Sequence, residues 1–380
     1  MIWLAGATLV LLLAFALEST LGSLTMRSLA ALPSEGEEWP RVSVVFAARD
    51  EELALEEAVR SLLALDYPDL EVVAVDDRSA DGTGRILATI AARDARLHPS
   101  SIRELPAGWL GKNHALHHGA AEATGELILF TDADVIFEPS ALKRAVRYMR
   151  ERRLDHLTAS PELVVRSLGV GVFVTAFAFF FSIFSKPWRV RWRSPRFHVG
   201  VGAFNLVRAS FYREQGGHEP IRMRPDDDMK LAKLLKKGGG TQELVFGRGM
   251  IRVAWYSTVR EAMRGLEKNA FSGVEYSMTL LTVGTIGIVL IMLWPFVALF
   301  ATSGGTRVVY ALMSALLIAL VGGIAVRARS APVWYALTFP AGVVLFIFVI
   351  WRAALLTVIR GGIDWRGTFY SLRDLRANRV

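Results

Sequence analysis

The sequence predicts an α/β domain with a mostly parallel sheet, flanked by N-terminal and C-terminal transmembrane helices. Strand-like apolar runs alternate with helical patterns between residues 41 and 131, and this alternation indicates a parallel sheet covered on both faces. About 20 apolar residues allow a helix to cross a bilayer. Long apolar runs with almost no charge flank the polar region, at residues 2–17, 278–301, 308–326 and 334–351.

The first apolar run predicts an anchor over residues 1–26. No Lys or Arg precedes it and no clear small-x-small cleavage site follows it, which argues against the alternative of a signal peptide. The first basic residue, Arg27, comes after the run. The positive-inside tendency therefore puts the N-terminus outside and the next domain in the cytosol. The chain has no cysteine, which excludes disulfides and thiolate metal sites and fits a reducing compartment.

The polar region predicts one domain over residues 38–275. Strands are expected at 41–47, 71–75 and 127–131, and helices at 51–65 and 82–92. Acidic clusters follow the second and third strands directly. Because ligands of such sheets bind at the carboxyl ends of the strands, we expect a nucleotide at this edge.

The segment 168–193 predicts an interfacial or re-entrant helix, because a full crossing would separate the acidic clusters at 132–134 and 226–228 across the membrane. Its second half interleaves Trp with Lys and Arg, which suits anionic lipid headgroups; a solvated basic loop is the alternative. The net charge of +8 points to the same partners. We expect no nucleic acid, since no known nucleic-acid motif is present.

The C-terminal part predicts transmembrane helices over 278–356 and a basic tail over 357–380. Three crossings from a cytosolic domain would end outside, yet an Arg-rich tail favours the cytosol. Either one run is re-entrant or the positive-inside rule fails here.

Asp132 and Asp134 predict a metal site. They stand one residue apart after an apolar strand, and Mg²⁺ or Mn²⁺ prefers oxygen ligands and bridges diphosphates. Turn capping is the alternative role for such a pair.

Three further residues at strand ends predict contacts to the base or ribose: Asp77, Arg49 and Glu51. The alternatives are helix capping near Asp77, by Ser79 or Asp81, and a favourable charge pattern at the start of a helix for residues 49–51.

Residues 108–116 (GWLGKNHAL) are expected to precede a helix. Lys112 could reach the nucleotide or diphosphate, and Gly111 allows close approach of the backbone. For His114, His117 and His118 we expect helix-surface or packing roles rather than a metal site.

Asp226, Asp227 and Asp228 open a predicted helix over 229–237. Three adjacent carboxylates repel, so at least one pKa should rise, and a raised carboxylate pKa suits a general base. Capping of the helix is the alternative, and one residue can cap while another faces the site.

In this order the motifs resemble the family 2 glycosyltransferases of the GT-A fold, over roughly residues 41–270. The motifs are VSVVFAARDEE, VVAVDDRSADGT, GWLGKNHAL, ILFTDAD, VGVGAFNLVRASFYREQGGHEP and DDDMKLAKLLKKGG. The Gln-x-x-Arg-Trp motif of processive synthases is absent, which leaves open the residue that contacts the leaving diphosphate. Together with the membrane segments, the set is similar to hopanoid-associated and ceramide glucosyltransferase-like lipid glycosyltransferases.

The resemblance implies an inverting hexosyltransferase of a bacterial-type plasma membrane. It would use a UDP- or GDP-sugar donor, Mg²⁺ or Mn²⁺, and a membrane lipid hydroxyl as acceptor. Asp77 and Asp132 would contact the nucleotide, and Asp228 would be the base, with Asp227 as its rival. The alternatives are a polyprenyl-phosphate sugar transferase, a non-catalytic nucleotide-sugar-binding membrane protein and a transporter.

Overall fold

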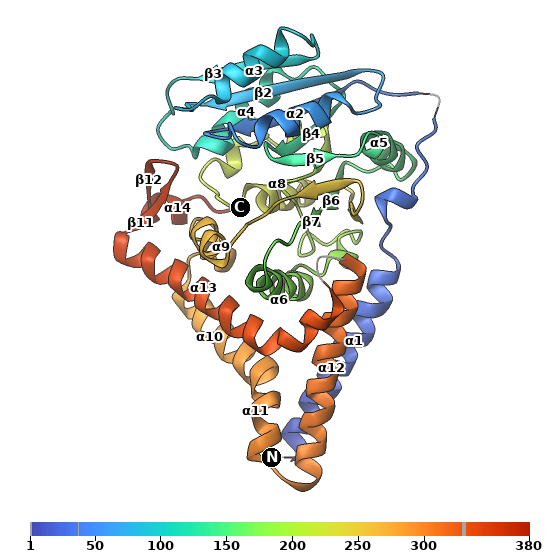
Figure 1. Cartoon of the computed structure of the whole chain (residues 1–380), viewed down its shortest axis with the longest axis vertical. Helices are drawn as coiled ribbons and strands as arrows, with labels where there is room; N and C mark the ends of the chain where they lie inside the picture. Colours follow the sequence, from blue (N-terminus) through green and yellow to red (C-terminus); the bar gives the residue numbers. More distant parts are fainter. Residues whose placement is uncertain (1, 37, 329–331) are drawn as a thin grey trace. The chain divides into compact units, whose positions relative to one another are not determined.

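The computed structural model describes residues 2–36, 38–328 and 332–380. They form two compact units, and the chain enters each of them more than once (Figure 1). The helical unit comprises Met1–Thr25, Val164–Trp188 and Trp255–Ile363. The sheet unit comprises Met26–Leu163, Arg189–Ala254 and Asp364–Val380.

The sheet unit is built on seven strands in the order β3-β2-β1-β4-β8-β6-β9. The strands are β1 (Val42–Ala48), β2 (Leu70–Asp77), β3 (Leu97–Ile102), β4 (Leu127–Asp132), β6 (His156–Ser160), β8 (Asn205–Arg208) and β9 (Gln242–Phe246). Neighbouring strands are parallel except at β8, which is antiparallel to β4 and β6. The predicted fold class, an α/β domain with a mostly parallel sheet, is confirmed.

Helices cover this sheet because their apolar faces complete its core. They are α2 (Leu55–Leu63), α3 (Thr83–Ala91), α4 (Gly111–Glu122), α5 (Ala141–Glu151), α7 (Ala209–Glu214) and α8 (Asp227–Lys237). Helix α4 packs closely on the sheet: a Cβ added at Gly119 would lie 2.7 Å from Val45 Cγ1. A second, smaller sheet joins β5 (Val135–Phe137), β10 (Ile251–Val253) and β7 (Glu162–Leu163).

One expectation about α4 is wrong. The segment 108–116 does not precede the helix, because α4 already begins at Gly111. Only residues 108–110 lie outside it, and Lys112 stands in its first turn.

The helical unit contains α1 (Ile2–Leu24), α6 (Leu168–Ser185), α9 (Val259–Leu266), α10 (Met278–Ile288), α11 (Trp294–Ala301), α12 (Gly304–Ala328) and α13 (Phe339–Arg360). Aromatic rings form part of its core: Phe180 stacks on Phe346 with the ring centroids 4.0 Å apart.

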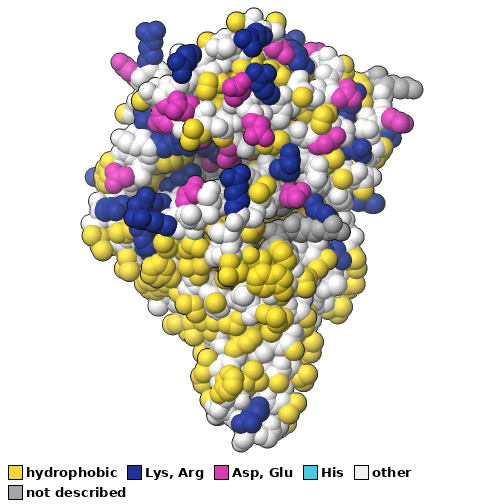
Figure 2. All heavy atoms as spheres, in the orientation of Figure 1, with side chains coloured by type: hydrophobic (Ala, Val, Ile, Leu, Met, Phe, Trp, Pro, Cys, Tyr) yellow, Lys and Arg dark blue, Asp and Glu magenta, His cyan; other side chains and the backbone are white. Residues whose placement is uncertain are grey.

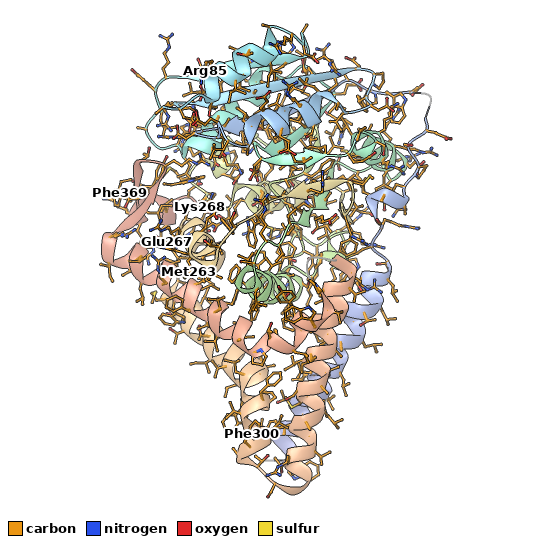
Figure 3. The ribbon with its side chains drawn as sticks, viewed as in Figure 1. Arg85, Met263, Glu267, Lys268, Phe300 and Phe369 are labelled. Carbon is orange, nitrogen blue, oxygen red and sulfur yellow. The ribbon has the colours of Figure 1, made fainter. Side chains whose placement is uncertain are left out.

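The outer surface of the helical unit is apolar. Among the described residues, five helical segments are long and apolar enough to cross a membrane: Ile2–Leu24, Leu168–Arg189, Met278–Ala301, Gly304–Arg327 and Val333–Arg360. Large side chains point outward from them, as at Trp3 (88% exposed) and Phe300 (89% exposed; Figure 3). Figure 2 shows these hydrophobic side chains crowded over the unit's surface. Because exposed apolar area costs about 25 cal/mol per Å² in water, this surface indicates membrane association.

Candidate active site

The carboxyl ends of β1, β2 and β4 meet at one edge of the sheet. Ala48 is in register with Asp76 of β2, and Ala47 is in register with Asp132 of β4. The acidic clusters that follow β2 and β4 therefore lie on the two sides of β1, at the edge where ligands of parallel sheets bind.

Asp77, the last residue of β2, is 3% exposed. Arg78 donates to both of its carboxylate oxygens, from Nε at 2.7 Å and from Nη2 at 3.0 Å. Arg49 adds a second cation, with Nη1 at 3.7 Å from Asp77 Oδ2. The φ of Arg78 is 59°, a left-handed conformation in which its side chain reaches back to β2. A nucleotide can reach Asp77 only if Arg78 shares or releases this carboxylate.

The turn after β1 is tied to the turn after β2. Asp50 Oδ1 accepts a hydrogen bond from Ala80 N at 2.8 Å, and Glu51 N donates to Thr83 Oγ1 at 2.9 Å. The Glu51 carboxylate forms an ion pair with Arg366, a residue of the C-terminal segment. The side chain of Asp50 thus stabilises the turn, whereas the side chain of Glu51 takes part in an ion pair with the C-terminal segment.

Lys112 connects two acidic clusters that are far apart in sequence. Its Nζ lies 2.8 Å from Asp132 Oδ1 and 3.2 Å from Asp227 Oδ2. Burial disfavours the ammonium charge, but the carboxylates of Asp132, Asp227 and Asp228 outweigh burial and raise the pKa of Lys112. Lys112 therefore remains cationic between the two clusters.

Asp134 lies in the turn between β4 and β5. Burial, and then the negative charges of Asp132 and Glu51, raise the pKa of Asp134 to about 6. Repulsion of this kind between carboxylates is relieved when a cation binds. Within the part of the chain that the structure describes, no three His, Asp or Glu side chains group closely enough to form a metal site by themselves.

Asp228 occupies the first turn of α8. Gly202 N donates to its Oδ2 at 2.9 Å, and Met229 N donates to its Oδ1 at 2.7 Å. Burial, followed by the charge of Asp227, raises the pKa of Asp228 to about 7. Helix α8 begins at Asp227 rather than at residue 229, so both acids lie inside the helix.

A glycine-containing loop before β8 closes on these acids. A Cβ at Gly202 would lie 2.5 Å from Asp132 Oδ2, and one at Gly200 would lie 1.9 Å from the Asp228 carbonyl oxygen. Buried amides hold the loop: Val199 N donates to Gln242 Oε1 at 3.1 Å, and Val201 N donates to Asn205 Oδ1 at 3.2 Å. Sequence reasoning assigned no role to these residues, although the alternating glycines of VGVG were visible.

Asn113 was also missed. Its side chain is fully buried on α4, and Nδ2 donates to Ile221 O at 2.8 Å and to Arg224 O at 2.9 Å. Asn113 therefore fixes the segment that leads into Asp226 and α8. The position of this asparagine, next to Lys112, was the only signal in the sequence.

Two of the three histidines of α4 lie beside Trp109, and the third, His118, lies near His114. His114 and His117 pack on the Trp109 ring at centroid distances of 5.5 and 5.0 Å. His118 Nε2 lies 3.0 Å from Ser100 Oγ. These contacts are compatible with the packing roles expected from the sequence.

One pocket of the sheet unit collects residues from β4, α4, α8 and the loop before β8. It is lined by Lys112, Leu116, Phe130, Thr131, Asp132, Gly202, Asn205, His218, Asp227, Asp228 and Leu231. The structure thus brings together Lys112, Asp132, Asp227 and Asp228. The other residues predicted for the site, Arg49, Glu51, Asp77 and Asp134, are outside this lining.

The sequence is similar to known glycosyltransferases. It is 29% identical over 185 residues to the "Putative glycosyltransferase EpsE" of Bacillus subtilis (strain 168), covering 48% of this chain and 62% of that protein. It is 30% identical over 158 residues to the beta-monoglucosyldiacylglycerol synthase of Synechocystis sp., covering 38% of this chain and 32% of that protein. The matches thus span less than two thirds of the relatives' own length.

The fold is similar to that of a mannosyltransferase, PcManGT from Pyrobaculum calidifontis, solved in complex with GDP-Man and Mn²⁺. The TM-score is 0.53 at 19% identity, covering 93% of this chain and 99% of that chain. The family described as "Glycosyl transferase family 2" matches residues 43–216, which include the strand ends, Lys112 and the loop before β8. Over residues 43–216 the chain therefore contains a domain that matches glycosyl transferase family 2.

Proposed function

We propose that the protein is an inverting glycosyltransferase that moves a sugar from a UDP- or GDP-sugar to the hydroxyl group of a membrane lipid. The observation that carries this proposal is the bridge formed by Lys112 between Asp132 and Asp227, with Asp228 beside it in the same pocket. This bridge joins the acid cluster proposed for the donor to the acids proposed for the acceptor.

Asp132 and Asp134 would hold the divalent metal. Their oxygens suit Mg²⁺ or Mn²⁺, and Mg²⁺ commonly uses only one or two carboxylates, with substrate phosphates and water completing its shell. The raised pKa of Asp134 fits a pair whose charge a cation would neutralise. When bound, the metal would offset the negative charge of the leaving diphosphate, and PcManGT was solved with GDP-Man and Mn²⁺.

Arg49, Glu51 and Asp77 would bind the nucleoside at the ends of β1 and β2, and Asp132 would approach its phosphates. Lys112 supplies a fixed positive charge next to Asp132, where the diphosphate would lie. Asp228 would take the proton from the acceptor hydroxyl, whose oxygen then attacks the anomeric carbon opposite the diphosphate. A single displacement inverts the configuration at that carbon.

Asp228 is a better candidate for the base than Asp227. Asp227 is ion-paired with Lys112, and a nearby cation weakens a carboxylate as a base. The pKa of Asp228, raised to about 7 by burial and by Asp227, lies near the operating pH, where general-base catalysis is efficient.

A lipid acceptor is supported by the apolar helical segments of the described residues and by the relative from Synechocystis, which is named beta-monoglucosyldiacylglycerol synthase. An amphiphile could remain in the bilayer while its head enters the site. We also propose that the sheet unit is cytosolic and that the basic Trp-containing segment 186–193 contacts anionic headgroups. Arg189 stacks on Trp192 with its guanidinium 4.6 Å from the ring, which leaves an amphipathic surface suited to that layer.

The test is metal-dependent release of UDP or GDP by the full chain in lipid nanodiscs, with a panel of donors and bacterial lipid extract. Release should require Mg²⁺ or Mn²⁺ and should vanish in Asp134→Ala. The matched control is Asp69→Ala, which removes an acid with a half-exposed side chain, 3.9 Å from Arg41, and should leave release intact. No release with any donor would favour a binding role. Transfer only to a polyprenyl phosphate would indicate the other transferase class.

Asp228→Asn tests the base. It should lower turnover by about 10²- to 10⁴-fold, the usual contribution of a general base, and leave the affinity for the nucleotide within about twofold. Full turnover in this variant would reject the assignment and would make Asp227→Asn the next variant to measure.

A further inference from the structure

The C-terminal segment Asp364–Val380 is part of the sheet unit. It begins within β11 (Gly362–Trp365), which follows α13 and forms a hairpin with β12 (Thr368–Ser371), and it ends with the short helix α14 (Leu372–Ala377) and the residues after it. The sequence predicted only a basic tail here. The contacts of this segment fall on two parts of the candidate site.

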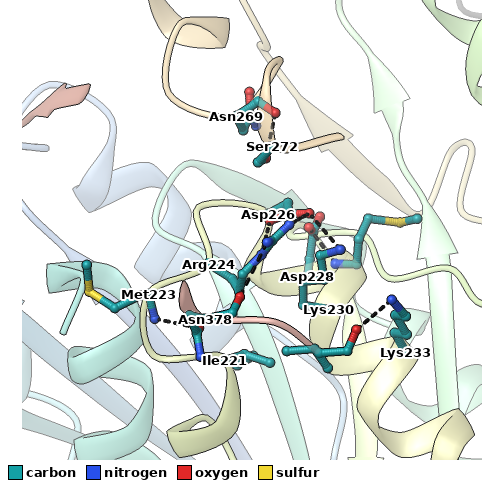
Figure 4. A network of polar contacts seen from close by, with 12 residues as sticks. Ile221, Met223, Arg224, Asp226, Asp228, Lys230, Lys233, Asn269, Ser272 and Asn378 are labelled. Atoms are coloured by element: carbon teal, nitrogen blue, oxygen red, sulfur yellow. Dashed lines mark hydrogen bonds and ion pairs between the residues drawn. The ribbon is translucent and has the colours of Figure 1, made fainter. Parts of the chain in front are cut away.

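Asn378 anchors the segment on the loop that leads into α8 (Figure 4). Its Oδ1 accepts from Met223 N at 3.0 Å, and its Nδ2 donates to Pro220 O at 3.0 Å. Its carbonyl oxygen accepts from Arg224 Nη1 at 3.4 Å. Arg224 is 1% exposed and is ion-paired with Asp226 at 3.0 Å. Asn378 is therefore linked through Arg224 to Asp226, which stands two residues before Asp228.

The hairpin tip is a two-residue turn. Arg366 has a φ of 47° and Gly367 a φ of 75°, as the twist-matched turns of tight hairpins require. This turn directs Arg366 to the carboxylate of Glu51, with which it forms an ion pair. Arg366 keeps a side-chain exposure of 40%, so its guanidinium can also reach a ligand.

Tyr370, on β12, is 6% exposed and lies against the start of α4. Its hydroxyl oxygen accepts from Gly111 N at 3.2 Å. It also interacts with Arg78, whose pKa is raised first by Asp77 and in smaller part by Tyr370. Tyr370 therefore contacts the residue before Lys112 and interacts electrostatically with the cation that covers Asp77.

The hairpin thus meets the three places assigned to the nucleotide: Glu51 after β1, Asp77–Arg78 after β2, and Gly111 before Lys112. We propose that the segment 364–380 forms a wall of the donor site, in which Tyr370 and Arg366 bind the nucleoside diphosphate and Asn378 is a positioning residue. A buried tyrosine offers a ring face to a base and a hydroxyl to a polar group, and an arginine suits phosphate. This inference rests on the proposed function.

The experiment measures UDP and GDP binding to the full chain in nanodiscs with Mn²⁺, by calorimetry. Tyr370→Ala and Arg366→Ala should each raise Kd by about 5- to 30-fold. This factor corresponds to a total loss of about 1–2 kcal/mol of binding free energy in each variant. Asn378→Ala should raise Kd less and should increase amide hydrogen exchange in 220–226. The matched controls are the neighbours Phe369→Ala, 53% exposed (Figure 3), and Arg373→Ala, both expected to bind like the wild type.

The possible results distinguish failure of this inference from failure of the proposed function. If the wild type binds a nucleotide and both tail variants bind equally well, the wall is rejected and the proposed function stands. Tighter binding in Tyr370→Ala would also reject it and would show that the hairpin blocks the site. If the wild type binds neither nucleotide, both the proposed function and this inference fail. If Tyr370→Ala does not fold, Arg366→Ala and Tyr370→Phe decide the result.

Discussion

Asp227 and Asp228 are adjacent in sequence, but their surroundings give them different chemistry. Asp227 has Lys112 at 3.2 Å, whereas Asp228 accepts hydrogen bonds from two backbone amides and titrates near neutrality because it is buried. A helix start favours acids in general. Here both acids line the pocket, and Asp227 is ion-paired with Lys112 while Asp228 is held by backbone amides.

The raised pKa of Asp228 predicts the pH dependence of turnover. The base must be ionised, and the pKa of Asp228 is raised to about 7, so its active form is lost as the pH falls below 7. The plot of log kcat/KM against pH should rise with a slope of about one and level off above pH 7. Nucleotide Kd measured over the same range is the control for donor binding. A flat profile from pH 5.5 to 8 would contradict the assignment.

Two glycines of one loop should respond differently to alanine. In Gly202→Ala the new Cβ meets Asp132 Oδ2 at 2.5 Å, the end of a side chain that can turn away. We expect at least about tenfold slower turnover, comparable to losing one hydrogen-bonded contact, with little change in Tm.

In Gly200→Ala the new Cβ meets the Asp228 carbonyl oxygen at 1.9 Å. Moving this backbone atom costs more free energy than turning the end of a side chain. Overpacking of this kind costs about 1–3 kcal/mol, and each kcal/mol lowers the Tm of a unit of this size by about 2–4 °C. Thermal melts and steady-state rates of the two variants, measured side by side, test this contrast. Equal melting temperatures of Gly200→Ala and Gly202→Ala would contradict this prediction and would show that the loop backbone can move to accommodate the new Cβ.

At the scale of elements, Asn113 of α4 holds the segment that leads into α8. Asn113 donates to the carbonyl groups of Ile221, Arg222 and Arg224, and its side chain is fully buried. Asn113→Ala leaves those carbonyls unsatisfied, at about 1–3 kcal/mol. We expect a lower Tm, lower turnover and faster hydrogen exchange in 220–226. Glu122→Ala, at the far end of α4, should change none of the three.

The sequence predicted the elements whose signal is local. β1, β2 and β4 are continuous apolar runs that end in charged residues, and their acids were identified for the same reason. β3 was missed because LHPSSI is polar and buries only Leu97 and Ile102, so its extended form depends on pairing with β2. The contacts of Asn113 and Tyr370 were missed because their partners lie far away in sequence. The periodicity of apolar residues along the sequence does not indicate such long-range contacts.

At the scale of the whole molecule, the chain leaves the sheet unit at Val164 and returns at Arg189, and leaves again at Trp255 and returns at Asp364. A folded sheet unit lies on one side of any membrane, so each excursion must cross it an even number of times. The first excursion contains one apolar helix, α6, which we therefore expect not to cross. The described residues of the second contain three apolar segments, of which we expect two to cross.

Labelling of single cysteines tests this topology, and the native chain adds no background because it has no cysteine. Glu57→Cys in α2 and Arg373→Cys in α14 should react with an impermeant maleimide from the same side of membrane vesicles. Ser303→Cys, between α11 and α12, should react from the other side. Labelling of Glu57→Cys and Arg373→Cys from opposite sides would refute the even count.

The return of Asp364–Val380 to the sheet unit also sets an order for biogenesis. A ribosome makes the strands, the acids and Lys112 first, then the apolar helices, and only afterwards Tyr370 and Asn378. A nascent chain that still lacks its last helices cannot complete the proposed donor wall. On this assignment, the protein acquires full affinity for its donor only after the helices destined for the bilayer have been synthesised, which would keep unfinished chains from consuming activated sugar.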